Sequence, residues 1–75
     1  MNTKFKRHQK VRLLVAPQEE DIEPYTDPPA KISAGAIGFI NILLPNGRYH
    51  VRIQDQEGNE LAYVAMDEEQ LEASA

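Results

Sequence analysis

The clearest pattern in the chain is a strict alternation of apolar and polar residues between positions 48 and 55. The apolar positions are Tyr49, Val51 and Ile53, and the polar positions between them are Arg48, His50, Arg52 and Gln54. Successive side chains of a β-strand point to opposite faces. The pattern therefore predicts a half-buried strand with one face in the core and one wet, partly basic face.

Two further apolar segments, at residues 36–44 and 61–66, flank this strand and predict an antiparallel meander. The connections, at residues 45–47 and 56–59, are short and contain glycine. Pro45 suits the second position of a type I turn, Asp55 suits the first position of the other turn, and Gly47 and Gly58 suit the left-handed conformation. We expect two tight hairpins.

The ends of the chain complete this arrangement. Residues 9–15 alternate and predict a first strand, and residues 67–70 predict one acidic helical turn in which Asp67 is the N-cap and Gln70 reaches back to it. Leu71 then begins a strand beside the first one. The sequence predicts an all-β fold, a small antiparallel barrel of about five strands with one short helical turn before the last strand. The expected core is Val11, Leu13, Val15, Ile37, Ile40, Ile42, Tyr49, Val51, Ile53, Val64, Met66 and Leu71.

Residues 16–34 interrupt the alternation and contain four of the five prolines, at positions 17, 24, 28 and 29. Proline removes a backbone donor and fixes φ, so this segment is expected to be a long, acidic, extended loop. A loop of this length is typically functional or disordered, and both interpretations stay open. Ile22, Tyr25 and Ile32 are the residues expected to pin it to the barrel. Gly35 and Gly38, which follow, indicate backbone curvature rather than a phosphate-binding loop, because no helix comes after them.

Three stretches of sequence carry a resemblance to a known family: KFKRHQKVRLL, SAGAIGFI and NGRYHVRIQDQEGNELAYVAMDEEQLE. They resemble small, uncharacterised bacterial proteins with an SH3-like barrel, and the same barrel is similar to accessory subunits of photosystem and ferredoxin–thioredoxin reductase partners. The resemblance covers about two thirds of the chain and departs from the family in the long proline-rich loop. It implies an SH3-like antiparallel barrel and no particular activity.

The composition limits what the chain can be. Seventy-five residues without cysteine imply one domain, residues 1–75, held together by apolar packing and strand pairing. The net charge is −4, yet residues 1–12 hold five of the eight Lys and Arg residues and no acid. A basic end on an acidic body suggests self-recognition or an acidic partner. The apolar stretches are too short to cross a bilayer, so we expect a cytoplasmic protein that does not bind membranes.

Candidate groups for catalysis or metal binding are few. His8 and His50 are the only histidines and do not stand at ligand spacing, and neither Ser33 nor Ser74 has a histidine nearby in sequence. The sequence therefore predicts no enzyme activity, no metal and no cofactor.

Two binding functions fit the pattern. The first is a non-enzymatic protein-interaction or accessory module whose partner is another protein or a second copy of the chain, because an acidic loop on such a barrel can bind a basic extended peptide. Its candidate residues are Glu19, Glu20, Asp21, Glu23, Tyr25 and Asp27. The alternative is a barrel that binds RNA or single-stranded DNA with its basic N-terminal strand, with Tyr49, Phe39 or Tyr63 as stacking surfaces, although Tyr49 shares a face with Val51 and Ile53 and is expected in the core. Its candidate cations are Lys4, Lys6, Arg7, Lys10, Arg12, Arg48 and Arg52.

Overall fold

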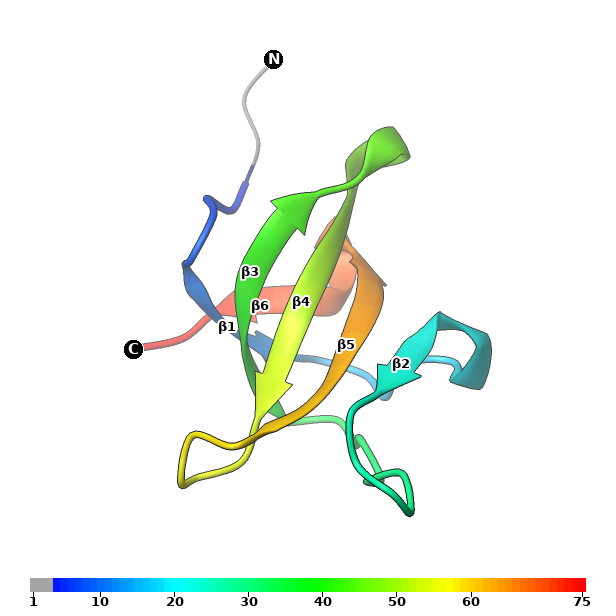
Figure 1. Ribbon diagram of the computed structural model, residues 1–75. Helices are drawn as coiled ribbons and strands as arrows, with labels where there is room; N and C mark the ends of the chain where they lie inside the picture. The colour runs from blue at the N-terminus through cyan, green and yellow to red at the C-terminus, as the bar shows by residue number, and fades with distance from the viewer. Residues whose placement is uncertain (1–3) are drawn as a thin grey trace.

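The computed structural model describes residues 4–75 as six antiparallel strands in one sheet, in the order β2-β5-β4-β3-β1-β6 (Figure 1). The strands are β1 (Lys10–Leu13), β2 (Ile22–Pro24), β3 (Ile37–Leu43), β4 (Arg48–Gln54), β5 (Glu60–Asp67) and β6 (Leu71–Ala73). Three 3₁₀ turns, η1 (Glu19–Asp21), η2 (Pro45–Gly47) and η3 (Glu68–Gln70), complete the fold, and residues 4–75 contain no α-helix. Nor does this part of the chain offer a helical segment with the length and hydrophobicity that a bilayer crossing requires.

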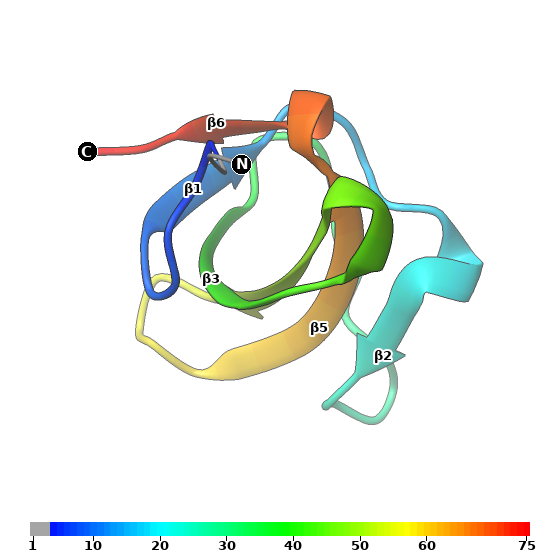
Figure 2. The ribbon, with the colours of Figure 1, turned by 90° about the horizontal axis from the view of Figure 1, so that it is seen from above.

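The sheet bends strongly around the core, as the view from above shows (Figure 2). Its edge strands β2 and β6 are not paired with each other, so the sheet is open. The all-β prediction is confirmed, and the predicted helical turn before the last strand is present as η3. The structure has six strands because the proline-rich loop contributes β2, which the proline pattern concealed.

The predicted alternation in β4 is confirmed. Tyr49, Val51 and Ile53 are at most 1% exposed, whereas the residues between them are half-buried on the outer face of the sheet. Nine of the twelve expected core residues are buried. They are Val11, Leu13, Ile40, Tyr49, Val51, Ile53, Val64, Met66 and Leu71.

The other three core predictions are wrong, each for a backbone reason. A β-bulge between Ile40 and Ile42 shifts the register, so Ile42 pairs with outward-facing His50 and is 41% exposed. Ile37 pairs with Arg12 and lies on the outer face, where it is half-buried. Strand β1 ends at Leu13, and Val15 beyond it is exposed.

The core also contains three residues that the alternation did not indicate: Phe5, Ile32 and Ala62. Phe5 precedes the first strand and meets Tyr49 edge to face, with ring centroids 5.4 Å apart. Ile32 packs into the core from the proline-rich loop, and Ala62 pairs with Ile53 on the inner face. Phe5 and Ile32 lie outside regular strands, where a period of two says nothing about burial.

Gly38 occupies the inward position of β3 because the backbone of β4 comes very close there. A Cβ atom at this position would lie 2.6 Å from the carbonyl oxygen of Arg52 and 2.7 Å from Cγ1 of Val51. Gly38 is therefore a close-approach glycine within a pleated strand.

The hairpin turns follow the predicted glycine chemistry with one correction. Gly47 and Gly58 have φ values of +74° and +87°, as expected for left-handed positions. Asn46 also has a positive φ, +66°, so the first turn is not type I. The predicted capping interaction at η3 is confirmed, because the backbone N–H of Asp67 donates to Oε1 of Gln70 at 2.9 Å.

Strand β2 holds the proline-rich segment against β5. Ile22, Glu23 and Pro24 pair with residues of β5, and the N–H of Tyr25 donates to the carbonyl of Leu61. In an antiparallel pair the backbone N–H and C=O groups of successive residues point to opposite sides of the strand. The backbone groups of Glu23 therefore face β5, and those of Ile22 and Pro24 face the free edge. The N–H of Ile22 is bonded to the carbonyl of Glu19, and Pro24 has no N–H. Of the three residues expected to pin the segment, Ile22 and Ile32 pack on the core, whereas Tyr25 is 52% exposed.

Candidate functional site

The outer face of the sheet carries one cross-strand row of chemically active side chains. The pairing register aligns these residues across five neighbouring strands, β2, β5, β4, β3 and β1, as Glu23, Tyr63, Arg52, Phe39 and Lys10. Residues that stand opposite each other in an antiparallel pair share a face and lie within contact distance. We call this set the outer row. The row begins with an acid on β2 and ends with a lysine on β1, and Arg52 lies between its two aromatic residues.

Near β2, the outer row joins an aromatic cluster of Tyr25, His50 and Tyr63. The rings of His50 and Tyr63 stack with centroids 4.7 Å apart and planes at 17°, and Tyr25 lies 5.0 Å from Tyr63. Nδ1 of His50 shares a hydrogen bond of 3.0 Å with Nδ2 of Asn41, which fixes the imidazole orientation. Desolvation raises the pKa of Tyr25, and a hydrogen bond with Tyr63 and the charges of nearby carboxylates raise it further. The phenol therefore stays protonated and can donate.

A groove of about 400 Å³ lies against this cluster. Its lining includes Glu20, Asp21 and Glu23 from the proline-rich segment and His50 and Tyr63 from the sheet. Glu20 and Glu23 are exposed, and among residues 4–75 no cation lies within ion-pair distance of either. We call the groove and the aromatic cluster together the acidic aromatic surface.

The structure brings together only part of the predicted acidic site. Glu20, Glu23 and Tyr25 belong to the acidic aromatic surface. Asp21 lines the same groove but is held by Arg48, at 3.2 Å between Oδ2 and Nη2. The last two candidates, Glu19 and Asp27, are exposed and do not line this groove.

The predicted basic site is divided as well. Arg12 donates to Glu72 at 2.8 Å, and Arg48 bridges Asp21 and Asp67 and also donates to the carbonyl of Ala65. These ion pairs raise the pKa of Arg48. Nζ of Lys4 lies 5.3 Å from the ring centroid of Phe5. The structure describes no carboxylate partner, within residues 4–75, for Lys6, Arg7 or Lys10.

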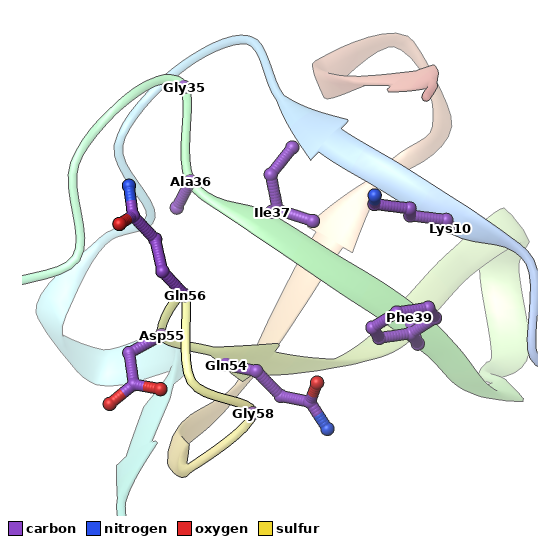
Figure 3. A pocket seen from close by; sticks show the side chains of 9 residues that line it. All are labelled: Lys10, Gly35, Ala36, Ile37, Phe39, Gln54, Asp55, Gln56 and Gly58. Carbon is purple, nitrogen blue, oxygen red and sulfur yellow. The ribbon is translucent and has the colours of Figure 1, made fainter. Parts of the chain in front are cut away.

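Beside the basic end of the outer row lies a second hollow, of about 600 Å³ (Figure 3). Lys10 of β1, Ile37 and Phe39 of β3 and Gln54 of β4 line it, together with the hairpin that joins β4 to β5. The carboxylate of Asp55 in that hairpin accepts the N–H groups of Glu57 and Asn59, each at 2.9 Å. These hydrogen bonds lower the pKa of Asp55, so it is an ionised turn-forming residue.

The sequence pattern indicated only part of the outer row. It treated Phe39 and Tyr63 as possible stacking residues and placed Arg52 on the wet face, but it did not connect them to Glu23. The signal that connects them is register, which depends on β2 and on the bulge in β3. Within the described residues no group of three or more potential metal ligands converges, and no charged or polar side chain is buried.

No protein-family model matches the chain, and neither the curated proteins nor the solved structures include a significant match. An assignment of function therefore depends on the geometry of the outer face.

Proposed function

We propose that the chain is an SH3-like barrel that acts as a non-enzymatic interaction module, and that its acidic aromatic surface binds a cationic, extended segment of another protein. The strand order β6-β1-β3-β4-β5, with a 3₁₀ turn before the last strand, supports this relationship to SH3-like barrels. Strand β2 is then an addition, contributed by the first loop to the edge of β5.

One observation carries the proposal, which is the position of carboxylates without an ion-pair partner in residues 4–75 beside a cluster of aromatic rings. Glu20 and Glu23 line a groove whose wall includes the stacked pair of His50 and Tyr63, and Tyr25 packs against Tyr63. A guanidinium or ammonium group gains from the face of an aromatic ring and from a carboxylate at the same time. Arginine suits this arrangement best because its planar group can stack and form a bidentate pair.

The contrast with Asp21 and Asp67 strengthens this argument. These two carboxylates are satisfied by Arg48, so they stabilise the fold. Glu20 and Glu23 have no such role in the described part of the chain, and their charges stay available to a partner. The negative net charge of the chain also favours a basic partner over an acidic one.

Nuclear magnetic resonance titration with a short arginine- and proline-containing peptide tests the proposal. We expect chemical-shift changes centred on Glu23, Tyr25 and Tyr63, and none with the same peptide carrying glutamate in place of arginine. The double variant Glu20→Gln/Glu23→Gln is expected to weaken binding at least tenfold, because each charge-assisted contact contributes about 1.5–3 kcal/mol.

The matched control is Glu57→Gln, which neutralises an exposed carboxylate in the β4–β5 hairpin. Equal loss of affinity in Glu57→Gln and in the double variant would mean that the peptide senses only net charge. Shift changes restricted to other faces would reject the acidic aromatic surface. Self-association that the peptide displaces would instead identify the partner as a second copy, whose basic N-terminal residues supply the cations.

A further inference from the structure

The outer surface of β3 is an apolar strip that the proposed peptide site does not use. Ile37 and Phe39 face outward and are half-buried, and the bulge turns Ile42 to the same side, where it is exposed. We call these three residues the β3 strip. It runs along most of a seven-residue strand and so has a length of roughly 20 Å.

Cations flank the β3 strip on both sides. Lys10 of β1 and Arg52 of β4 stand opposite Phe39 on its two neighbouring strands. Arg7 lies further along the β1 side, where its Nε donates to the carbonyl of Asn41 at 3.0 Å. Because neighbouring strands are about 4.8 Å apart, the backbone positions of Lys10 and Arg52 are roughly 10 Å from each other.

Two of these three cations, Arg7 and Lys10, keep their charge available. Arg7 and Lys10 have no carboxylate partner within residues 4–75. Arg52 differs from them, because Oε1 of Glu60 lies 4.0 Å from its Nε and forms a long ion pair with it, while its guanidinium lies 5.9 Å from the ring centroid of Phe39. The surface around the β3 strip is therefore locally positive, although the net charge of the chain is −4.

An open hollow adjoins the same side chains. Its volume is about 600 Å³, within the usual range for small-ligand sites. Figure 3 shows the ammonium group of Lys10 over the Ile37 end, with Phe39 and the amide of Gln54 at the other end. A primary amide donates and accepts hydrogen bonds, which is the chemistry that reads the edge of a nucleobase.

We propose that the β3 strip binds single-stranded nucleic acid, with a base stacked on Phe39, a second base in the hollow beside Ile37, and phosphates at Arg7, Lys10 and Arg52. An apolar surface with an aromatic ring, flanked by Arg7 and Lys10 on one side and by Arg52 on the other, can contact both the bases and the phosphates of a single strand. An acidic peptide would supply negative charge for the cations but no planar ring to stack on Phe39. A free nucleotide would supply both a ring and a phosphate, but it would occupy the hollow and leave Phe39 without a second base.

Fluorescence anisotropy with a labelled oligouridine of about 8 nucleotides tests the proposal, and about three phosphate contacts are expected. The logarithm of the affinity should then fall by about 2 for each tenfold rise in salt. Phe39→Leu keeps the apolar volume but removes the ring, so it should weaken binding roughly tenfold. Lys10→Gln should reduce both the affinity and the salt slope, and circular dichroism verifies that both variants are folded.

The matched control is Lys31→Gln, which removes an exposed cation from the loop between β2 and β3. The proposal is overturned by absence of binding at low salt, by unchanged affinity in Phe39→Leu, or by equal effects of Lys31→Gln and Lys10→Gln. Competition by oligoglutamate as strong as by unlabelled RNA also overturns it. Uridine monophosphate that competes as well as the oligomer would identify a nucleotide site instead. Glu20→Gln/Glu23→Gln should bind RNA normally, so this test is independent of the proposed peptide site.

Discussion

Strands β3 to β5 and the proline-rich segment are held in place by different means. The three strands pair along most of their length, with one register shift in each pairing, and their inward side chains form most of the core. Residues 14–35 are held by fewer contacts, chiefly the three-residue strand β2, the buried side chain of Ile32, the ion pair of Asp21 with Arg48 and a few backbone hydrogen bonds. The β3 strip belongs to the first region, and most carboxylates of the acidic aromatic surface belong to the second. The acidic aromatic surface should therefore be disrupted by smaller losses of stability than the β3 strip.

Val51→Asp is expected to reduce stability the most, because Val51 lies at the centre of the sheet formed by β3, β4 and β5. Val51 is fully buried in β4, and an unpaired charge there costs several kcal/mol against a total stability of about 3–5 kcal/mol. The protein should be unfolded, as a collapse of amide shift dispersion would report. Gln54→Asp, which introduces the same residue at an outward position of β4, should leave the fold intact. A folded Val51→Asp variant would contradict the inward register of β4.

Gly38→Ala is expected to destabilise the sheet by about 3 kcal/mol. The new Cβ would lie 2.6 Å from a backbone oxygen, which cannot rotate away as a side chain can, so β3 and β4 must separate. Gly58→Ala is the control, since that site is spatially open and costs only the positive φ, about 1 kcal/mol. Chemical denaturation measures both. Equal losses would mean that the close approach at Gly38 is relaxed in solution.

Ile32→Ala is the most direct way to compare the local stability of the proline-rich segment with that of the sheet. Removing most of a buried isoleucine should cost about 2 kcal/mol, at the low end for such changes because Ile32 retains 6% exposure at the margin of the core. The loss should concentrate in the proline-rich segment. Hydrogen exchange should accelerate at the Tyr25 amide, which bonds to Leu61, more than at amides between β3 and β4. Uniform acceleration would show that the segment and the sheet unfold as one unit.

Arg48→Met should have a smaller effect, about 1 kcal/mol. Arg48 is partly exposed, so its ion pairs with Asp21 and Asp67 are screened by solvent, and methionine retains much of the apolar stem. The loss should shrink in high salt, in contrast to that of Ile32→Ala, and urea denaturation at two ionic strengths checks this. A loss independent of salt would assign the role of Arg48 to packing.

A hydrogen bond of Tyr49 gives the sheet a dependence on alkaline pH. Its buried hydroxyl donates to Oε2 of Glu68 at 2.7 Å, and desolvation, followed by this bond, raises its pKa. A raised folded-state pKa adds stability that is complete below the unfolded value of about 10 and is lost as pH rises through the folded value. The stability advantage of the wild type over Tyr49→Phe should therefore shrink above about pH 10. An advantage that stays constant there would mean that the phenol does not ionise with unfolding.

The sequence predicted the regions whose order comes from repetition. The alternation of Tyr49, Val51 and Ile53 was sufficient to place β4, and the glycines located both hairpins. It did not predict Ile42, because a bulge changes the face of every later residue without leaving a mark in the pattern. Nor did it predict β2, since Pro24 argues against a strand unless the strand lies at an edge.

The candidate sites were predictable to the same extent. Charge alone suggested the carboxylates and the cations, and the structure then removed those that form ion pairs, such as Arg12 with Glu72. The assembly of Glu23 with Tyr63, and of Phe39 with Arg52 and Lys10, depends on pairing between strands distant in sequence. A one-dimensional pattern does not contain that pairing.

The outer edge of β2 has a consequence for how the protein behaves at high concentration. A growing fibril needs a row of vacant backbone donors and acceptors on which the next chain can align. At this border the amide of Ile22 is already committed to Glu19, and Pro24 has none to give. Neither outward-facing position of β2 therefore offers a free backbone N–H, which disfavours the addition of a further strand at this edge.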